Sequence, residues 1–391
     1  MPTTSIWQSE VPPLGVSREL PAGADVVVVG AGLLGVSTAY WLKREDPNLD
    51  VVLLDAERVA HGASGRNAGF LLQGSASDAQ TDLERYGAER MRRLWQLTRE
   101  NAELIASELD PAAFDHRTRG SFTVAGDADE ESRLRESGPL LHAFGVSATF
   151  LPADDLNRRL GSRQFYGGLW MPDNAEGHPA KLVRHIAERS GAAIVEDCRV
   201  LDIRPAGSSL VASTESGASI EAPRAVLAMN AYLPNVSAEF ADTVRPVRAQ
   251  MLSTEPVSLD RLPAPIYSHE GYFYLRQRAD GRLVLGGARH LHRHEEVGYA
   301  DTTTPALQAD LEAYLAMHFP DLAGTLVDHR WSGVMGFSEN GLPQLGIQHD
   351  GRLVWMAGFT GHGMSLGFRA GKTVAALALG NETPQHWIGQ E

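Results

Sequence analysis

The chain has 391 residues, of which 43% are hydrophobic and 21% are charged, and its formal net charge is −14. This length exceeds what one hydrophobic core usually supports, so we expect a globular protein with two domains. The acidic balance argues against nucleic acid or an anionic membrane as the main partner, because either would require a basic surface. The single cysteine, Cys198, excludes an intrachain disulfide and a cysteine metal cluster.

Residues 1–15 have neither a basic start nor the apolar core of a secretory signal, so we expect a cytoplasmic protein. The longest apolar run, 26–42, contains three glycines and is only 17 residues long. That length is at the short limit for a membrane span, and the run is better explained by a nucleotide-binding motif. We therefore predict no membrane span.

Residues 25–45 (DVVVVGAGLLGVSTAYWLKRE) combine a strand, a glycine-rich turn and a helix. Four consecutive valines predict a strand that is buried on both faces. Gly30, Gly32 and Gly35 have G-x-G-x-x-G spacing. The first permits a tight turn, the second lets the backbone approach a pyrophosphate, and the third lets the helix pack against the strand.

A second apolar strand, 50–54, ends at Asp55, whose carboxylate can accept hydrogen bonds from a ribose. Strand, glycines, helix, strand and acid at this spacing predict a dinucleotide site, and we also place Leu34 and Ala56 in it. This motif alone does not distinguish NAD from FAD.

The next segment, 61–70 (HGASGRNAGF), consists almost entirely of small residues. Following a dinucleotide motif, it resembles the FAD-dependent D-amino acid oxidase (DAO) superfamily, and it is most similar to the γ-glutamylputrescine oxidoreductase-type amine oxidases. The resemblance implies an α/β fold with α+β elements. A Rossmann-like FAD-binding domain would be joined to a second domain whose mixed or antiparallel sheet roofs the flavin. It also implies cofactor contacts, along the pyrophosphate and the flavin edge, from Gly62, Ala63, Ser64, Arg66, Asn67, Ala68, Gly69 and Phe70.

Two further segments resemble cofactor-binding parts of the same superfamily. Pro179 and Gly191 predict the start and end of a helix that precedes a strand. The run 225–234 predicts another buried strand that ends in Asn230. The resemblance places the backbone near Val200 against the adenine and makes Asn230 and Gly333 cofactor residues.

The C-terminal run 352–371 (RLVWMAGFTGHGMSLGFRAG) predicts a strand, a glycine-rich turn and a helix. A helix N-terminus there would direct its positive dipole end toward the flavin N1–C2=O edge and stabilise the reduced ring. Its GFTGHGM motif resembles the closing motif of the superfamily, so the likeness spans nearly the whole chain. The predicted contacts are Gly358, Thr360, Gly361, His362, Gly363 and Met364. His362 contacts the flavin or substrate, or it is a packed histidine.

The likeness implies a discontinuous division of the chain. Segments 1–76, 176–242 and 330–391 would form the FAD-binding domain, and segments 77–175 and 243–329 the substrate-binding domain. Residues 78–109 predict one long amphipathic helix.

Residues 271–290 (GYFYLRQRADGRLVLGGARH) predict a β-hairpin with its turn at Asp280-Gly281. Tyr272 and Tyr274 share one face by period-two alternation. The resemblance makes them candidate active-site residues, although an aromatic pair on a strand is more often core. His290, His292 and His294 also alternate, but their very polar surroundings are typical of a solvated loop. We predict no metal site.

The resemblance implies oxidation of a small-molecule amine. A hydride passes from the α-carbon to flavin N5, and the resulting imine is hydrolysed to a carbonyl product. The protein would position the C–H bond and exclude water, without a required acid or base.

Three departures from the superfamily refine these expectations. Segment 331–346 has no cysteine, and Arg66 occupies the place of a flavin-linked histidine, so we expect non-covalent FAD. Met335 occupies the place of a carboxylate-clamping arginine. An amine whose carboxylate is remote or absent is therefore expected, although Arg276 or Arg289 could substitute. Strand 282–287 lacks the lysine that helps oxygen react, so the electron acceptor is O2 or another oxidant.

Two alternatives remain at this stage. An NAD-dependent dehydrogenase accounts for the motif from Gly30 to Asp55 but not for HGASGRNAGF or GFTGHGM. A flavin-bound binding or assembly protein, without catalysis, accounts for all three cofactor segments and for the missing lysine and clamp.

Overall fold

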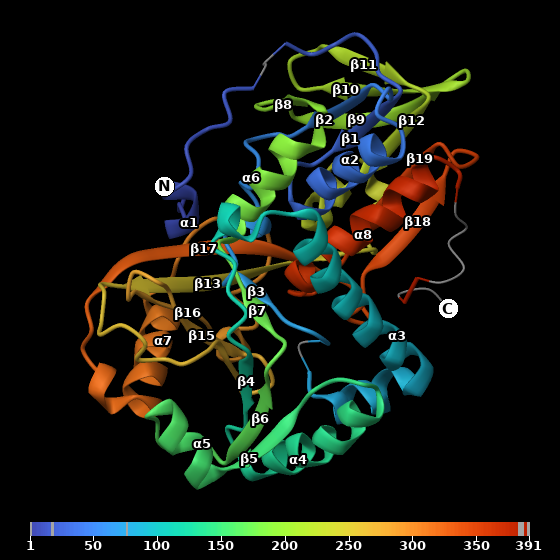
Figure 1. Cartoon of the computed structure of the whole chain (residues 1–391). Helices are drawn as coiled ribbons and strands as arrows, with labels where there is room; N and C mark the ends of the chain where they lie inside the picture. Colours follow the sequence, from blue (N-terminus) through green and yellow to red (C-terminus); the bar gives the residue numbers. More distant parts are fainter. Residues whose placement is uncertain (1, 17–18, 76, 382–386, 389–391) are drawn as a thin grey trace.

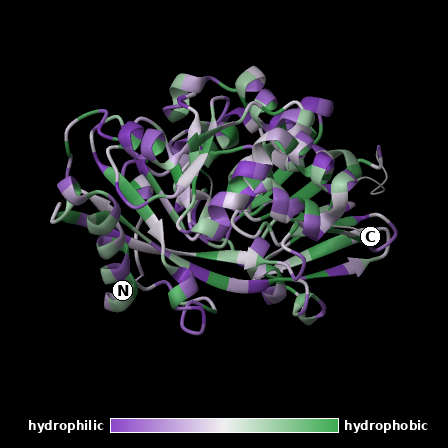
Figure 2. Cartoon of the chain, turned by 90° about the horizontal axis from the view of Figure 1, so that it is seen from below, coloured by the Kyte–Doolittle hydropathy of each residue, from purple (hydrophilic) through white to green (hydrophobic). Residues whose placement is uncertain are grey.

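The computed structural model describes residues 2–16, 19–75, 77–381 and 387–388. Two main sheets organise the chain: a six-stranded sheet with its helices in the upper part of Figure 1, and an eight-stranded sheet in the lower part. Figure 2 shows hydrophobic and hydrophilic residues mixed along many of the helices. The predicted fold class, α/β with a mixed second sheet, is confirmed.

The six-stranded sheet has the strand order β18-β19-β12-β1-β2-β8, and only β18 runs antiparallel to its neighbour. The strands are β1 (Val26–Val29), β2 (Val51–Leu54), β8 (Ala193–Val195), β12 (Arg224–Leu227), β18 (Gln344–Gln348) and β19 (Leu353–Ala357). Its helices are α2 (Leu33–Glu45), α6 (Pro179–Ser190) and α8 (Gly363–Ala378). A three-stranded sheet adjoins it, formed by β9 (Val200–Ala206), β10 (Ser209–Thr214) and β11 (Ser219–Ala222).

The first strand–helix–strand prediction is confirmed, since all four valines of β1 are buried and Gly30 follows them directly. The predicted helix from Pro179 to Gly191 is also confirmed as α6, which Gly191 ends with φ 68°. The strand that was predicted within 225–234, with its end at Asn230, is shorter than expected. It ends at Leu227, and Asn230 begins a 3₁₀ helix. A proline at position 234 fits this irregular segment better than it fits a central strand.

The eight-stranded sheet has the order β17-β13-β16-β15-β14-β4-β6-β5, and only the β14–β4 pair is parallel. Its strands are β4 (Ser121–Val124), β5 (Thr149–Pro152), β6 (Gly167–Met171), β13 (Arg245–Thr254), β14 (Ile266–Ser268), β15 (Phe273–Gln277), β16 (Leu283–Gly287) and β17 (Val327–Phe337). The predicted hairpin is β15–β16, with Gly281 in the connection at φ +90°. Tyr272 lies just before β15 rather than within it.

Helices α4 (Ala128–Ala143), α5 (Ala153–Leu160) and α7 (Pro305–His318) belong to this lower part (Figure 1). The long helix α3 (Ala79–Glu108) packs against α8 and α4. The prediction of one continuous helix was wrong at Gly87, whose φ of 75° and ψ of 163° interrupt it. Glycine adopts this conformation readily because it lacks a Cβ.

Shorter elements complete the described part of the chain. They are α1 (Ile6–Ser9), the two-stranded pair β3 (Phe70–Leu71) and β7 (Ala175–Glu176), and six 3₁₀ helices: Ala63–Gly65, Pro111–Phe114, Asn230–Asn235, Ala238–Phe240, Arg289–Leu291 and Pro320–Leu322. No helix in the described ranges has both the length and the apolar character needed to cross a membrane.

The strands of the six-stranded sheet all come from segments 1–76, 176–242 and 330–391. Residues 1, 76 and 391, where some of these segments begin or end, lie outside the described residues. Strand β17 lies mostly within the third segment, yet it pairs with β13 in the eight-stranded sheet. The division into two domains at these boundaries stays a prediction.

Helices α2 and α8 approach closely because glycines on α8 face α2. A Cβ at Gly371 would lie 2.5 Å from Ser37 Cβ, and one at Gly367 would lie 2.8 Å from Leu33 Cδ2. This contact fixes the position of the turn between β1 and α2 relative to the start of α8.

We predict that Gly371→Ala destabilises the protein by about 1–3 kcal/mol, because the new methyl group overpacks the contact between the two helices. Gly138→Ala in α4 is the matched control. Apart from its chain neighbours, its Cβ would meet only Leu169 Cδ2 at 3.6 Å, and the gain in helix propensity is opposed by Pro139 next to it, so stability should change by less than about 1 kcal/mol. Thermal unfolding of both variants checks this, and a G371A variant as stable as the wild type would contradict it.

Candidate cofactor site and active site

One cavity of about 920 Å³ is lined by residues of both main sheets. Its volume is at the upper end of the usual range for small-molecule sites. Most of the predicted site residues line it: Gly30, Gly32, Leu34, Asp55, Ala56, Gly62, Ala63, Ser64, Arg66, Asn67, Ala68, Phe70, Val200, Asn230, Tyr272, Tyr274, Gly333, Met335, Thr360, Gly361, His362, Gly363 and Met364. Gly35, Gly69 and Gly358 do not line it.

Those three glycines support the cavity wall from behind. A Cβ at Gly35 would lie 1.7 Å from the Gly30 carbonyl oxygen, so the helix α2 could not pack against the β1 turn with any larger residue. Gly69, at φ +76°, would clash with the Gly177 carbonyl oxygen at 2.1 Å. The Gly358 N–H donates to Asn230 Oδ1 at 2.9 Å, which ties β19 to the end of β12.

Asp55 lies at the carboxyl end of β2, on the dinucleotide side of the cavity. Its Oδ2 accepts from the Ala31 N–H at 2.6 Å and its Oδ1 accepts from the Glu57 N–H at 2.9 Å. Burial raises the pKa of Asp55 to about 6, although these two hydrogen bonds oppose the rise. Additional donors, such as ribose hydroxyls, would favour its ionised form.

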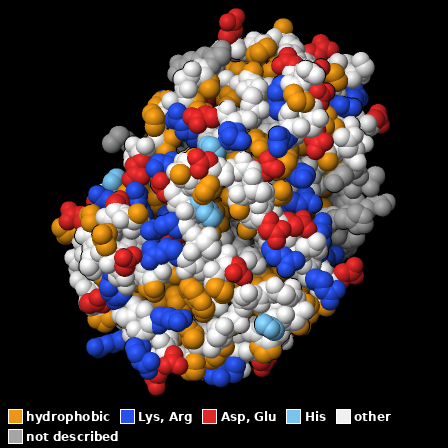
Figure 3. Space-filling view, in the orientation of Figure 1, with side chains coloured by type: hydrophobic (Ala, Val, Ile, Leu, Met, Phe, Trp, Pro, Cys, Tyr) orange, Lys and Arg blue, Asp and Glu red, His pale blue; other side chains and the backbone are white. Residues whose placement is uncertain are grey.

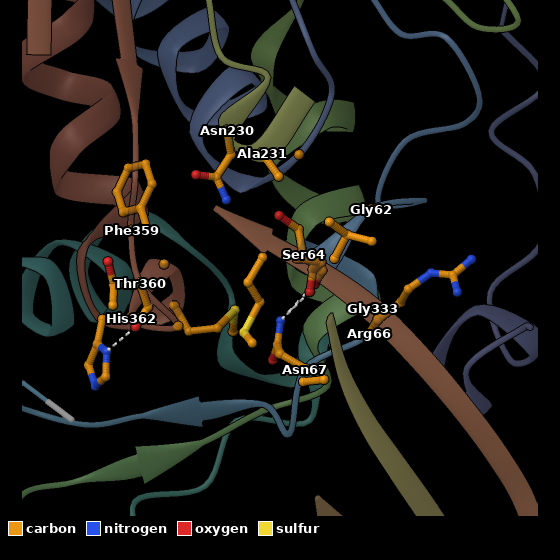
Figure 4. A pocket seen from close by; sticks show the side chains of 18 of the residues that line it. Gly62, Ser64, Arg66, Asn67, Asn230, Ala231, Gly333, Phe359, Thr360 and His362 are labelled. Carbon is orange, nitrogen blue, oxygen red and sulfur yellow. Dashed lines mark hydrogen bonds between the residues drawn. The ribbon is translucent and has the colours of Figure 1, made fainter. Parts of the chain in front are cut away.

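The segment 60–69 turns its carbonyl oxygens toward protein donors. Gln8 Nε2 donates to His61 O at 2.7 Å, Ser5 Oγ to Gly65 O at 2.6 Å, Trp331 Nε1 to Arg66 O at 2.8 Å, Trp7 Nε1 to Asn67 O at 2.7 Å and Arg276 Nη1 to Gly69 O at 3.1 Å. The Asn67 side chain holds the same segment by donating to Ala63 O and Ser64 O (Figure 4). The segment is therefore fixed from outside the cavity.

Arg66 has protein partners for its guanidinium. Nη1 forms an ion pair with Asp301 Oδ2 at 3.0 Å and donates to Ser332 O, while Nε donates to His61 O. In Figure 4 its side chain points away from Asn67 and His362. Burial raises the pKa of Asp301, but hydrogen bonds from Thr3 and Ser332 and the charge of Arg66 outweigh this and lower it. Arg66 thus braces the segment against β17 in this structure.

At the other end of the cavity, α8 begins at Gly363, directly after the turn 358–362. The first N–H groups of a helix and its dipole give this end a partial positive charge. His362 precedes the helix, and its Nδ1 lies 3.2 Å from Thr360 O (Figure 4). Burial lowers the pKa of His362, so the imidazole is neutral near pH 7.

Aromatic rings form the wall contributed by the eight-stranded sheet. The Tyr267 and Tyr274 ring centres are 6.0 Å apart, and Phe70 lies 5.8 Å from Tyr267. Burial raises the pKa of Tyr267 to about 12 and raises that of Tyr274 still further, so both phenols are neutral. Gly286 makes room for this wall, since a Cβ there would lie 2.3 Å from the Tyr274 ring.

Two arginines, Arg276 and Arg289, could replace the carboxylate-binding arginine whose place Met335 occupies, and the structure puts only one of them at the cavity. Arg276 lies outside the cavity, where Nη1 donates to Gly69 O and Gly177 O and the side chain pairs with Glu176 at 3.6 Å. Arg289 lines the cavity, as does Met335.

The three histidines of the 290–294 run do not share a strand face. Residues 289–291 form a 3₁₀ helix, and His292 pairs with Asp310 at 2.6 Å. In the described part of the chain, no group of three or more His, Cys, Asp or Glu side chains is arranged to hold a metal ion.

Sequence reasoning missed several residues around the cavity. Tyr267 and Phe337 line it, and the N-terminal arm reaches it through Pro2. The buried Trp7 of α1 was not assigned any role. The sequence signal for the arm was weak, because an isolated Ser-x-Trp in a short Pro-rich arm does not specify its contacts.

Three features of the residues that line the cavity fit a bound FAD. The Gly30–Gly35 turn leaves no room for side chains, Asp55 offers a carboxylate at the end of β2, and the cavity continues from there to the aromatic wall and the start of α8. Backbone N–H groups at the start of α2 and side-chain-free backbone are what a pyrophosphate requires.

Comparisons with known proteins agree with this geometry. The sequence model of the family described as FAD dependent oxidoreductase (DAO) matches residues 25–377. The protein named probable oxidoreductase OrdL of Rhizobium meliloti is 29% identical, covering 98% of this chain and 90% of that protein. The γ-glutamylputrescine oxidoreductase of Escherichia coli is 29% identical, covering 91% of this chain and 84% of that protein.

Among solved structures, glycine oxidase from Bacillus cereus superposes with a TM-score of 0.79 at 20% identity, covering 94% of this chain and 99% of that one. This likeness shows a shared fold. With a family match over most of its length, the chain belongs to the DAO family of FAD-dependent oxidoreductases.

Proposed function

We propose that this protein oxidises a primary or secondary amine to an imine, which water hydrolyses to a carbonyl product. The observation that carries the proposal is one cavity that joins Gly30 and Asp55 to the aromatic wall formed by Phe70, Tyr267 and Tyr274 and to the start of α8. The rings offer an apolar surface to the carbon that carries the amine, and neither phenol is an anionic counter-ion that would hold the nitrogen as an ammonium instead of the neutral amine. Amine oxidation requires this form, because the nitrogen lone pair assists loss of the hydride.

Bound FAD would accept the hydride from the carbon that carries the amine. The chain's own residues would position that carbon: Tyr272, Tyr274 and Met335 from the eight-stranded sheet or its ends, and the neutral His362 from the turn before α8. The start of α8 at Gly363 would stabilise negative charge on the bound ring. The name of the E. coli relative, an oxidoreductase of a putrescine derivative, supports an amine substrate.

The electron acceptor is proposed to be O2 or another oxidant. The chain's three lysines, Lys43, Lys181 and Lys372, are all described, and none lines the cavity. No lysine ammonium is therefore available there to promote the reaction with oxygen. A cytoplasmic location also stays a prediction.

We predict that anaerobic addition of a suitable amine bleaches the flavin absorbance of the purified holoenzyme. The panel is polyamine conjugates, N-methyl amino acids and D-amino acids, and re-admitted oxygen followed by a peroxide assay identifies the acceptor. If no member of the panel bleaches the flavin, the proposal fails in favour of a non-catalytic flavin-bound protein.

We propose that FAD is held non-covalently. Arg66 is engaged by Asp301, segment 331–346 contains no cysteine, and Cys198 does not line the cavity. Acid precipitation should therefore release all of the flavin into the supernatant, measured by its absorbance. Flavin that stays with the denatured pellet would contradict this prediction.

Asp55 should make FAD affinity depend on pH. Its pKa of about 6 lies above the unfolded value of about 3.9, so in the cofactor-free protein its stabilising effect is lost as the pH rises through 6. Ribose hydroxyls that donate to the carboxylate would reverse this preference and expel the proton. FAD should therefore bind about tenfold more weakly at pH 5 than at pH 7.

Flavin fluorescence titrations at both pH values measure this effect. Asp55→Asn should bind FAD more weakly and with little pH dependence between pH 5 and 7. Asp46→Asn is the control, because Asp46 is exposed at the end of α2 and should leave the wild-type pH dependence intact. An unchanged pH dependence in D55N would rule out this role for Asp55.

A further inference from the structure

The N-terminal arm, residues 2–10, contacts both halves of the structure. In Figure 1 its helix α1 lies apart from β1, the next strand of the chain. On one side the arm contacts α6 and segment 60–69, and on the other it contacts β17 and Arg278. Pro2, at the start of the arm, lines the cavity. The arm is therefore positioned to act on the cofactor site from outside it.

The helix of the arm depends on these contacts for its structure. α1 has only four residues, and a helix this short is not stable by itself in water. A capping box between Ser5 and Gln8 supports its start. Ile6 and Trp7 supply its apolar contacts, with 2% and 1% of their surfaces exposed. The arm therefore keeps this structure only while it is docked.

The indole of Trp7 packs among charged and polar side chains. The Cζ atoms of Arg276 and Arg278 lie 5.1 and 4.8 Å from the centre of a Trp7 ring, and the His178 ring makes a T-shaped contact at 5.0 Å. Glu10 joins the same group, because Arg278 Nη2 donates to its Oε1 at 2.7 Å and His178 Nε2 lies 3.3 Å from its Oε2. These contacts fix the direction of the indole N–H.

The ion pairs of Glu10 are more sheltered than most surface pairs. Acidic and basic side chains are interspersed over the face of the molecule shown in Figure 3, and exposed pairs contribute little to stability. By contrast, the side chain of His178 is 2% exposed and that of Arg278 is 12% exposed. Salt screens sheltered charges less, so these pairs help to hold the arm in place at physiological ionic strength.

A chain of hydrogen bonds leads from the arm to the start of α2. Trp7 Nε1 donates to Asn67 O at 2.7 Å, and Asn67 Nδ2 donates to Ser64 O at 3.1 Å. Ser64 Oγ accepts from the N–H of Leu33, the first residue of α2, at 2.9 Å. Backbone N–H groups in this turn are the donors that a pyrophosphate requires. Trp7 thus helps to position that turn, although it does not itself line the cavity.

We propose that docking of the N-terminal arm and binding of FAD strengthen each other, with Trp7 as the positioning residue. Both act on segment 60–69, since the arm binds its carbonyl oxygens from outside and the proposed cofactor contacts are on its cavity side. Two binding events that favour one conformation of a shared segment favour each other by the same factor. This coupling concerns retention of the cofactor, so it does not depend on which substrate is oxidised.

Hydrogen exchange measured by mass spectrometry tests the coupling in the wild-type protein. Exchange in peptides from the arm is compared between FAD-free protein and protein saturated with FAD. A chain terminus exchanges through local opening, and FAD should make that opening rarer. Exchange in the arm should therefore slow by roughly 5- to 10-fold when FAD binds.

A tryptophan variant tests the same coupling from the side of the cofactor. Trp7→Phe removes the indole N–H but keeps an aromatic ring beside the two arginines. In a flavin fluorescence titration it should bind FAD about 5- to 10-fold more weakly, which corresponds to the loss of one buried hydrogen bond.

Trp387→Phe is the matched control for this variant. Trp387 is also buried, and its Nε1 donates to Pro343 O at 2.9 Å, but neither residue lines the cavity. Both variants should lower the unfolding temperature of the FAD-free protein, because each loses one buried hydrogen bond. Only W7F should lose FAD affinity, a difference that a purely structural role of Trp7 would not produce.

Two serine variants decide the question if W7F does not fold. Ser5→Ala removes the donor to Gly65 O at 2.6 Å, whereas Ser9→Ala removes only a bond to Ile6 O within α1 at 2.7 Å. S5A should bind FAD more weakly than the wild type, and S9A should bind it equally well.

Three results would overturn the proposal: FAD leaves exchange in the arm unchanged, neither W7F nor S5A weakens FAD binding, or W387F weakens it as much as W7F does. Any of them would reduce the arm to a structural role. None of these measurements involves turnover, so flavin bleaching by the amine panel would still support the proposed function.

Discussion

The rest of the cavity depends on the anchoring of segment 60–69 by its own carbonyl oxygens. A chain made of small residues has few side chains to fix it, so the protein holds its backbone instead. Donors from α1, β15 and β17, including the indoles of Trp7 and Trp331, bind successive carbonyl oxygens from behind. The opposite side of the backbone can then face a cofactor without intruding side chains. Hydrogen-bonded, buried carbonyl groups of this kind are costly to leave unpaired, which makes the arrangement specific.

The N-terminal arm acquires its importance from the same constraint. Ser5, Trp7 and Gln8 all donate to this segment, and Trp7 is almost fully buried. Arg66, which the motif suggested as a cofactor contact, extends this bracing toward β17 through Asp301 and Ser332. One face of the segment thus serves stability, and the other is available for the proposed cofactor contacts.

Much of the fold was predictable because it follows local rules. Four valines, three spaced glycines and Asp55 specify β1, α2 and β2 with little dependence on the rest of the chain. The helix α6 is likewise specified by its terminal Pro179 and Gly191. The break at Gly87 and the early end of β12 at Leu227 were missed because the hydrophobic pattern continues through both places, although a glycine within the helical pattern and Pro234 after the strand were local signals of irregular backbone.

In the candidate site, too, some residues could be predicted from the sequence and others could not. Residues in glycine-rich motifs could be placed, since backbone conformation restricts the sequence there. Arg276 and Arg289 could not be distinguished from the sequence, because both lie in or beside the same hairpin and only the packing decides which one reaches the cavity. Tyr267 was missed for a similar reason, as it enters the aromatic wall by pairing of β14 with β15.

One half of the cavity is shaped mainly by the backbone of segment 60–69, and the other half by side chains of the eight-stranded sheet. This difference has an evolutionary consequence. Exchanging Tyr272, Arg289, Met335 or Phe337 alters side chains that project from β15–β17 or their ends, without disturbing the carbonyl contacts that fix segment 60–69. Lineages that share this scaffold can therefore diverge in the molecules they accept while the cofactor half stays nearly constant. Sequence drift among such relatives should concentrate on the inward-facing positions of these strands.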